Sequence, residues 1–213
     1  MDERILTIRK KLKKKLTPDR YEHSLSVSYT AVALAMRYGY DLDRAELAGL
    51  LHDCARQYDN QTIYEKCLKK GLTVTADEEK SKVLLHAKYG SYLTAHKYGI
   101  DDPEILSAIE FHTTGRPDMS LLEKIIYIAD YIEPRRCKAS NLEHMRKLAF
   151  IDLDKALFEI MTGILQYLDE THATVDQQTR EACNWYREKG NTLHFQNNQE
   201  LISKINGGTY EYM

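Results

Sequence analysis

Helix start and stop signals constrain the fold of this chain more than any other feature of its sequence. Thr17-Pro18 is typical of an N-cap followed by the first residue of a helix, and Gly39 is typical of a helix end. Ser120 and Glu123 have the spacing of a capping box at another helix start. The 10 glycines and 4 prolines fall between periodic segments, and no segment shows the alternation expected of a strand. The sequence therefore predicts an all-α fold.

The chain divides into three parts. Apolar residues recur at helical spacing in residues 1–16, so we expect an N-terminal amphipathic helix there, with a solvated basic face. Residues 17–190 are predicted to form one compact helical domain, because 213 residues suit one sizeable core and are short for two. Residues 191–213 are polar and Asn-rich, which predicts a weakly attached tail. Asp43 and Glu46 resemble a capping box, so we expect a helix to begin there. The other helices expected within the domain cover residues 17–38, 62–69, 78–98, 103–112, 120–132, 153–168 and 174–188.

Charge and cysteine usage exclude several classes of protein. The formal net charge is −2, so the chain as a whole has no attraction to nucleic acid or to an anionic membrane. No apolar stretch approaches the length of a membrane span, and no signal peptide is visible. The 4 cysteines are scattered singly, which favours neither thiolate metal binding nor a disulfide framework. We therefore expect a cytoplasmic protein with no nucleic-acid or membrane partner.

Histidines and aspartates occupy the apolar faces of several predicted helices. His23 shares a face with Val27, Ala31 and Leu34 at positions i, i+4, i+8 and i+11. Similar spacing places other imidazoles and carboxylates inward, so the full candidate set is His23, His52, Asp53, His86, His112 and Asp130.

Burying these groups without partners would be costly, at roughly 1–3 kcal/mol for each unsatisfied group. A single inward histidine is more often a satisfied core residue than a ligand, but six such groups together weaken that interpretation. A bound cation removes the cost, because neutral imidazole and carboxylate then become ligands. The absence of cysteine from the set favours iron, manganese, cobalt or nickel over structural zinc. The pattern therefore indicates a metal site.

The ordered set resembles the signature of the HD phosphohydrolase superfamily. His23, the pair His52-Asp53 and the distant Asp130 are similar to its histidine, histidine-aspartate and aspartate positions. The resemblance implies that these four residues bind one metal ion. It also implies that His86 and His112 either bind a second ion bridged by Asp53 or contact substrate phosphates.

A narrower resemblance covers about residues 17–185. The segments Arg20–Ser24, Ala48–Arg56, His112–Arg116 and Ala129–Arg136 are similar to the bacterial YqeK-type proteins, which are compact helical HD enzymes. The resemblance implies symmetrical hydrolysis of diadenosine tetraphosphate to two ADP, with iron as the metal and Asp53, His86 and His112 at the catalytic centre. The segment after Gly190 matches nothing in that family.

The chemistry of phosphoanhydrides suits these residue types. A metal neutralises phosphate charge and activates water at neutral pH. A guanidinium group can donate two parallel hydrogen bonds to phosphate oxygens. Arg56 and Arg136 are therefore candidate phosphate clamps, with Arg116 and Arg135 weaker ones, although each could be an ordinary surface charge. A helix beginning near Thr174 would offer free N–H groups to a phosphate. Together with the resemblance, these arguments give a substrate-binding set of His23, Asp53, Arg56, His86, His112, Thr113, Asp130, Arg136, His172 and Thr174.

Three alternatives stay open at this point. The same metal site could hydrolyse a cyclic nucleotide, guanosine tetraphosphate or a deoxynucleoside triphosphate. The chain could instead be a non-catalytic nucleotide-sensing module, although an intact ligand set argues against that. A helical di-iron oxygenase is disfavoured, because no Glu-x-x-His segment occurs. The helical surface is compatible with a homodimer.

Overall fold

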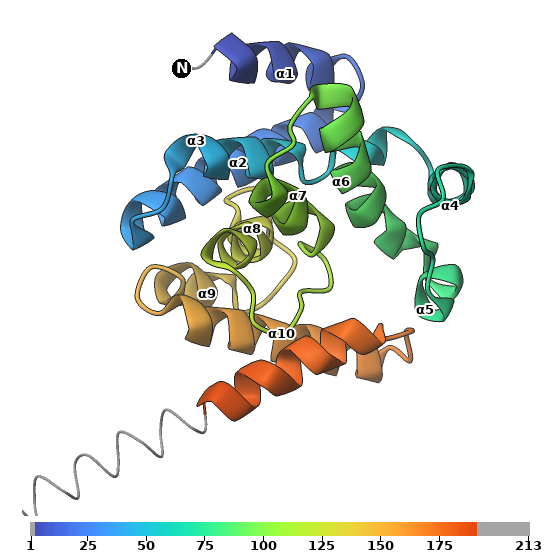
Figure 1. Cartoon of the computed structure of the whole chain (residues 1–213). Helices are drawn as coiled ribbons and strands as arrows, with labels where there is room; N and C mark the ends of the chain where they lie inside the picture. The colour runs from blue at the N-terminus through green and yellow to red at the C-terminus, as the bar shows by residue number, and fades with distance from the viewer. Residues whose placement is uncertain (1–2, 191–213) are drawn as a thin grey trace, which may run out of the picture.

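The computed structural model describes residues 3–190, and every regular element in that range is helical (Figure 1). The all-α prediction is therefore confirmed. The named elements are α1 (Glu3–Lys13), α2 (Pro18–Tyr38), α3 (Leu42–Leu51), η1 (Cys54–Gln57), α4 (Asn60–Lys69), α5 (Ala76–Lys80), η2 (Lys82–Leu84), α6 (Leu85–Tyr98), α7 (Pro103–Glu110), α8 (Leu121–Ile132), α9 (Leu142–Leu148) and α10 (Leu153–Glu170). Residues 177–190 are also helical. The predicted tail 191–213 lies outside the described residues.

Capping explains where the main helices begin and end. The Thr17 side chain accepts a hydrogen bond from the Arg20 N–H at the start of α2, and Gly39 ends that helix in the left-handed region with φ 69°. At the start of α8, Ser120 and Glu123 form the reciprocal capping box that the sequence predicted.

Several predicted helix boundaries are wrong. Asp41, and not Asp43, caps α3, and its side chain accepts from the Arg44 N–H. The predicted helix over 78–98 is broken, because Ser81 adopts φ −123° and ψ 69° and separates α5 from η2 and α6. Helix α9 was not predicted, and the last helix begins at residue 177 rather than near Thr174.

Helix α8 lies in the middle of the bundle and contacts α2, α3, α7, α9 and α10 (Figure 1). It is buried along most of its length, and it carries the isoleucines Ile125, Ile126 and Ile128 into the core. Burying each such side chain contributes about 1.5–3 kcal/mol relative to exposure. Helix α1 contacts α2, and its side chains Ile5 and Leu12 are buried. Because α8 is held on several sides, side chains on its surface have fixed positions.

Two glycines permit the close packing around the end of α3. A Cβ atom on Gly49 would lie 2.8 Å from the Ser28 Cα of α2, a distance that real Cβ atoms do not adopt. A Cβ atom on Gly90 of α6 would lie 3.3 Å from the His52 carbonyl oxygen. Helices α2 and α6 can therefore both approach the segment that carries His52 and Asp53.

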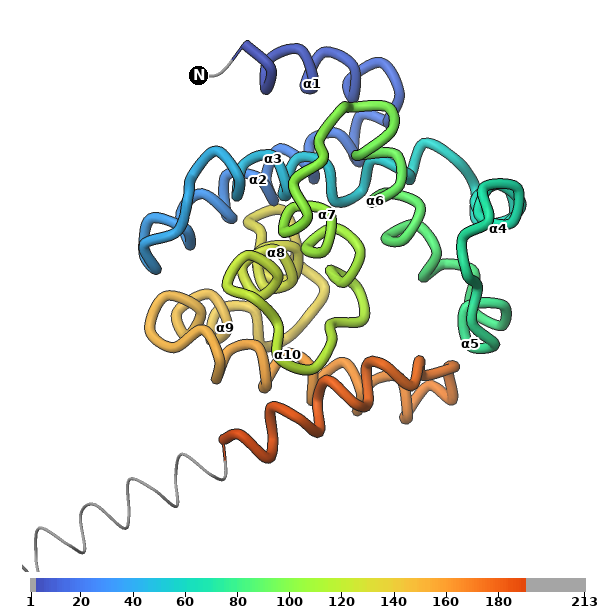
Figure 2. The backbone as a smooth tube through the Cα atoms, in the orientation of Figure 1, coloured from blue at the N-terminus to red at the C-terminus, as the bar shows by residue number. Residues whose placement is uncertain are grey.

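Helix α5 contacts the start of the helical segment 177–190. Figure 2 shows α5 beside the turn between α10 and the helical segment 177–190, where the Gln177 N–H donates to Asp77 Oδ2 at 3.1 Å. No helix within residues 3–190 has the length and apolarity needed to cross a membrane. All 4 cysteines are free thiols.

Candidate active site and metal centre

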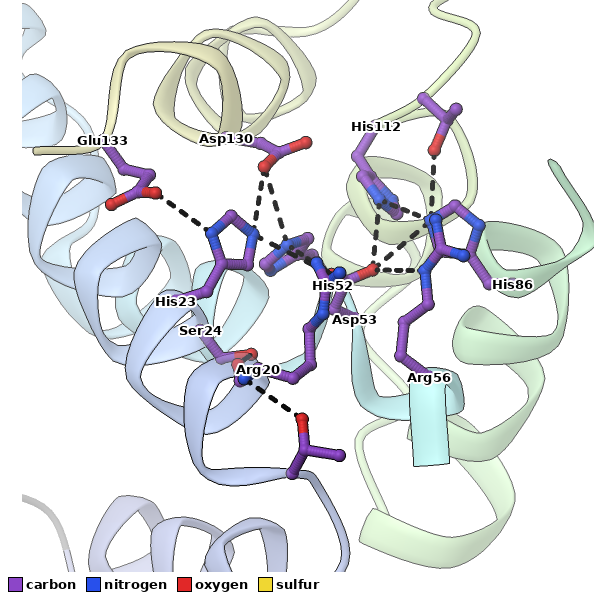
Figure 3. Close-up of polar contacts among 12 residues, drawn as sticks. Arg20, His23, Ser24, His52, Asp53, Arg56, His86, His112, Asp130 and Glu133 are labelled. Carbon is purple, nitrogen blue, oxygen red and sulfur yellow. Dashed lines mark hydrogen bonds and ion pairs between the residues drawn. The ribbon is translucent and has the colours of Figure 1, made fainter. Parts of the chain in front are cut away.

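Six side chains converge between α2, α6 and α8 (Figure 3). His23 comes from the second turn of α2, and Asp130 from the last turns of α8. The other four lie at helix ends: His52 and Asp53 directly follow α3, His86 is in the first turn of α6, and His112 follows α7. All six are the residues that the sequence analysis singled out.

The first group of ligand atoms surrounds one oxygen of Asp53. His23 Nε2 lies 3.1 Å from Asp130 Oδ1 and 3.8 Å from Asp53 Oδ2. His52 Nε2 lies 3.5 Å from Asp53 Oδ2 and 4.0 Å from Asp130 Oδ1. Ligand atoms of His23, His52 and Asp130 lie within 4.8 Å of one another, so these side chains could share one cation.

The second group faces the other oxygen of Asp53. Its Oδ1 lies 3.3 Å from His86 Nε2 and 3.8 Å from His112 Nε2. The two Nε2 atoms are 3.1 Å apart. The two oxygens of one buried carboxylate thus point toward two pairs of imidazoles, which is the arrangement expected of a residue that could bridge two ions.

The Nδ1 atoms of the four histidines fix the ring orientations. His52, His86 and His112 each donate Nδ1–H to the carbonyl oxygen three residues earlier, at 2.7, 2.5 and 2.7 Å. His23 differs, because its Nδ1 lies 3.2 Å from a carboxylate oxygen of Glu133. With the proton on Nδ1, the Nε2 lone pair of each neutral ring faces the centre. This is the tautomer that a metal ligand needs.

Unsatisfied polar atoms test whether the residues fit a cation. His23 Nε2, His52 Nε2 and Asp53 Oδ1 are buried and have no hydrogen-bond partner within the described part of the chain. His86 and His112 present two acceptor nitrogens to each other, and neither neutral ring has a proton left to share. His86 Nε2 also lies 3.3 Å from the Thr113 hydroxyl oxygen, but the other atoms have no such partner. Leaving such groups unsatisfied is costly, and cations bound in the two groups would satisfy them. The residues therefore fit a metal.

Burial and charge set the protonation of the centre. Burial is the main cause that lowers the pKa of His86 to about 3 and that of His112 to about 4, so both rings are neutral at neutral pH. Burial also acts to raise the pKa of Asp53 and Asp130, but the neighbouring imidazoles outweigh it and hold both well below the usual range. For His52, burial lowers the pKa, yet the charge of Asp53 leaves it raised. The centre thus carries two ionised carboxylates.

Arginines hold these two carboxylates on their solvent side. Arg20 Nη1 donates to Asp53 Oδ2 at 2.6 Å, and Arg136 Nη2 donates to Asp130 Oδ1 at 2.8 Å. Arg56 Nε lies 3.5 Å from Asp53 Oδ1. Arg116 is elsewhere, because its Nε donates to the buried Glu123 at 2.8 Å. Sequence analysis did not single out Arg20, although its place one turn before His23 was a signal that it shares the same helix face.

A cavity of about 330 Å³ opens beside His112 and Asp130, and we call it the first cavity. Of the predicted substrate-binding residues, Thr113, Arg136 and Thr174 also line it. His172 does not line it; its side chain is exposed and its backbone has φ 53°. Apolar and aromatic side chains complete the walls, among them Tyr127, Tyr131, Ile164 and Leu168. The first cavity combines an apolar wall with polar groups at the metal centre, as small-molecule sites do.

Known proteins and a solved structure match most of this chain. The profile of the HD domain family matches residues 20–135, more than half of the chain. The chain is 42% identical over 161 residues to "Bis(5'-nucleosyl)-tetraphosphatase, symmetrical" of Halalkalibacterium halodurans, covering 74% of this chain and 83% of that protein. It is 37% identical over 174 residues to the protein of the same name from Bacillus subtilis, covering 82% and 92%. A crystal structure from Clostridium acetobutylicum, titled as a predicted HD superfamily hydrolase involved in NAD metabolism, matches with TM-score 0.83 and 42% identity, covering 86% of this chain and 96% of that one. This chain therefore belongs to the HD domain family and, within it, to the group of proteins named symmetrical bis(5'-nucleosyl)-tetraphosphatases.

Proposed function

We propose that this chain is a metal-dependent phosphohydrolase that cleaves diadenosine tetraphosphate symmetrically into two ADP. The observation that carries the hydrolytic part is Asp53, whose two oxygens face two separate pairs of histidines. The choice of substrate rests on the relatives, which share 37–42% identity with most of this chain and are named for this activity.

In this proposal, His23, His52, Asp53 and Asp130 bind one cation, and Asp53, His86 and His112 bind a second. The short distances between their ligand atoms support these sets. Iron is the proposed metal, with manganese, cobalt or nickel as substitutes, because the set contains imidazole and carboxylate but no thiolate. When bound, such a cation neutralises phosphate charge and makes water nucleophilic at neutral pH.

The arginines would bind the tetraphosphate. Arg20, Arg56 and Arg136 now lie near or contact the carboxylates that a cation would neutralise, so metal binding would leave their guanidinium groups free for phosphate oxygens. Thr113 and Thr174 line the first cavity and would contact the nucleotide half placed there. His172 is retained only as a proposal, since its exposed side chain lies outside that wall.

Direct attack by water is favoured over a covalent intermediate. Cys54 is the nucleophilic side chain next in sequence to Asp53, but burial raises the pKa of its thiol to about 12. Its Sγ lies 3.5 Å from the Gly90 carbonyl oxygen, to which it donates, rather than from a base. A protonated, buried thiol is inert as a nucleophile.

We also propose that the protein is a bacterial, cytoplasmic enzyme that forms a homodimer. Four free cysteines support a reducing compartment. The bacterial relatives support the source. Light scattering on the purified protein tests the dimer.

Product analysis tests the function directly. Metal-loaded protein is incubated with diadenosine tetraphosphate in oxygen-18 water, and the nucleotides are separated by chromatography. The expected result is ADP alone, with one of every two molecules labelled on its terminal phosphate. Recovery of AMP and ATP would contradict symmetrical cleavage, and the absence of turnover of this and other nucleotides would favour a nucleotide-sensing module instead.

A further inference from the structure

A second cavity adjoins the metal centre beside His23. It has a volume of about 540 Å³ and lies between the start of α2 and the segment 133–138. We call it the basic cavity, because its lining includes Arg20, Arg135, Arg136 and Lys138. His23 also lines it, so it reaches the ligand groups directly. Figure 3 shows His23 and Glu133 on the opposite side of the centre from His86.

The positive charges of this cavity are only partly neutralised by the protein. Its two acidic groups are Asp19, 4.0 Å from Arg135, and Glu133, which accepts from His23 and from the Arg135 backbone N–H. Lys138 is exposed and has no hydrogen-bond or ion-pair partner within residues 3–190. Arg20 and Arg136 pair with Asp53 and Asp130 of the metal centre. A cation bound by those two carboxylates would leave the four cationic side chains of this cavity facing only Asp19 and Glu133, a surplus of positive charge that attracts a polyanion.

Arg136 connects the two cavities, since it lines both of them. Arg20 likewise reaches from the basic cavity to Asp53 at the centre. A phosphate chain that enters the first cavity and passes the metal ligands would therefore continue into the basic cavity. A third cavity also includes Arg136 and Lys138, but its lining includes none of the six residues of the metal centre.

The two cavities that adjoin the centre differ in what they offer a nucleoside. The first contains two tyrosines, and the hydroxyl of Tyr127 is buried without a hydrogen-bond partner within the described residues. The basic cavity has no Phe, Tyr or Trp in its lining. Aromatic side chains and unpaired polar groups recognise a base, whereas guanidinium and ammonium groups recognise phosphate.

From this difference we propose that the basic cavity binds the second nucleoside diphosphate half of a dinucleoside tetraphosphate. It binds this half through the phosphates and makes no contact that distinguishes one base from another. The inference rests on the proposed function, since it concerns the other half of the same substrate. It makes the enzyme selective for one base and tolerant of the other.

Charge reversal in the basic cavity tests the binding role. The double variant Arg135→Glu with Lys138→Glu is expected to raise the KM for diadenosine tetraphosphate about tenfold and to leave kcat and the Kd for ADP unchanged. Lys69→Glu with Lys70→Glu is the matched control, because both lysines are exposed at the far end of α4 and line neither cavity. An unchanged KM in the double variant would overturn the proposal. So would an equal rise for Tyr167→Ser, since Tyr167 lines only the third cavity.

Two further measurements separate this proposal from the proposed function. Binding of a methylene analogue that cannot be cleaved at its centre is measured by calorimetry on metal-loaded protein. Weaker binding to the double variant than to wild type supports the basic cavity even if no hydrolysis occurs; equal binding overturns it. With active enzyme, an adenosine–uridine tetraphosphate is expected to have about half the kcat/KM of the diadenosine compound, because only one orientation is productive. A fall in kcat/KM of tenfold or more would show that the enzyme recognises the second base, which would overturn the proposal.

Discussion

Removing metal should make the stability of this protein strongly dependent on pH between about 4 and 6.5. His86 and His112 are buried as neutral rings, with pKa values lowered from 6.5 to about 3 and about 4. Below pH 6.5 the unfolded chain takes up protons that these two folded rings do not. Stability is therefore full above the unfolded pKa and is lost as the pH falls toward the folded values.

The size of the effect follows from the two rings. Each contributes up to about 1.4 kcal/mol per pH unit within this window. Allowing for partial titration near 6.5, lowering the pH from 6.5 to 5 should cost on the order of 3 kcal/mol for the pair. Asp53 and Asp130 add little between pH 6.5 and 5, because their folded pKa values are lowered and the unfolded carboxyls titrate near 3.8; below about pH 5 they add to the loss in the same direction. Glu110 acts in the opposite direction, since burial raises its pKa.

Urea unfolding in the presence of a chelator, at several pH values from 7 to 4.5, measures this slope. His86→Asn removes one titrating ring and should reduce the pH-dependent loss by about half, which separates the histidine contribution from that of Glu110. Equal slopes for wild type and His86→Asn would refute the reasoning, because they would show that this buried ring does not control the response.

Three other changes have expected outcomes. Gly49→Ala places a Cβ atom 2.8 Å from the Ser28 Cα and should destabilise the protein by about 1–3 kcal/mol. The midpoint of urea unfolding measures this loss, and an unchanged midpoint would show that α2 and α3 can move apart at no cost. Asp53→Ala should abolish bound metal in elemental analysis, and full retention would disprove its role as a ligand. Metal at 100 times its Kd should stabilise the wild type by about 2.7 kcal/mol over the chelated protein, an increase absent from Asp53→Ala.

Periodicity and capping residues predicted much of this structure. His23, His52 and Asp130 lie inward because each continues an apolar face, and that property is local to one helix. The reciprocal cap of α8 is equally local, since Ser120 and Glu123 belong to the same turn. Such features can be predicted from one sequence because few alternatives satisfy the backbone groups at a helix end.

Features that depend on distant segments were missed. Nothing in the apolar pattern of 78–98 marks the break at Ser81, which leaves α5 free to meet the residue 177 region. Helix α9 has seven residues and no side-chain cap, so its sequence carries little signal. Arg116 was proposed as a phosphate clamp, but it donates to Glu123, a pairing that depends on how the loop folds onto α8.

The four histidine rings differ in which substitutions elsewhere in the chain can change their orientation. Three rings are held by backbone carbonyl oxygens, which every amino acid provides at that position. Substituting the residues at positions 49, 83 or 109 leaves the acceptor itself in place. His23 alone depends on a side chain, that of Glu133, for its orientation. A point mutation at position 133 can therefore alter the orientation and basicity of a single ring. Divergence between related enzymes at this position would adjust the centre without replacing any of its six converging residues.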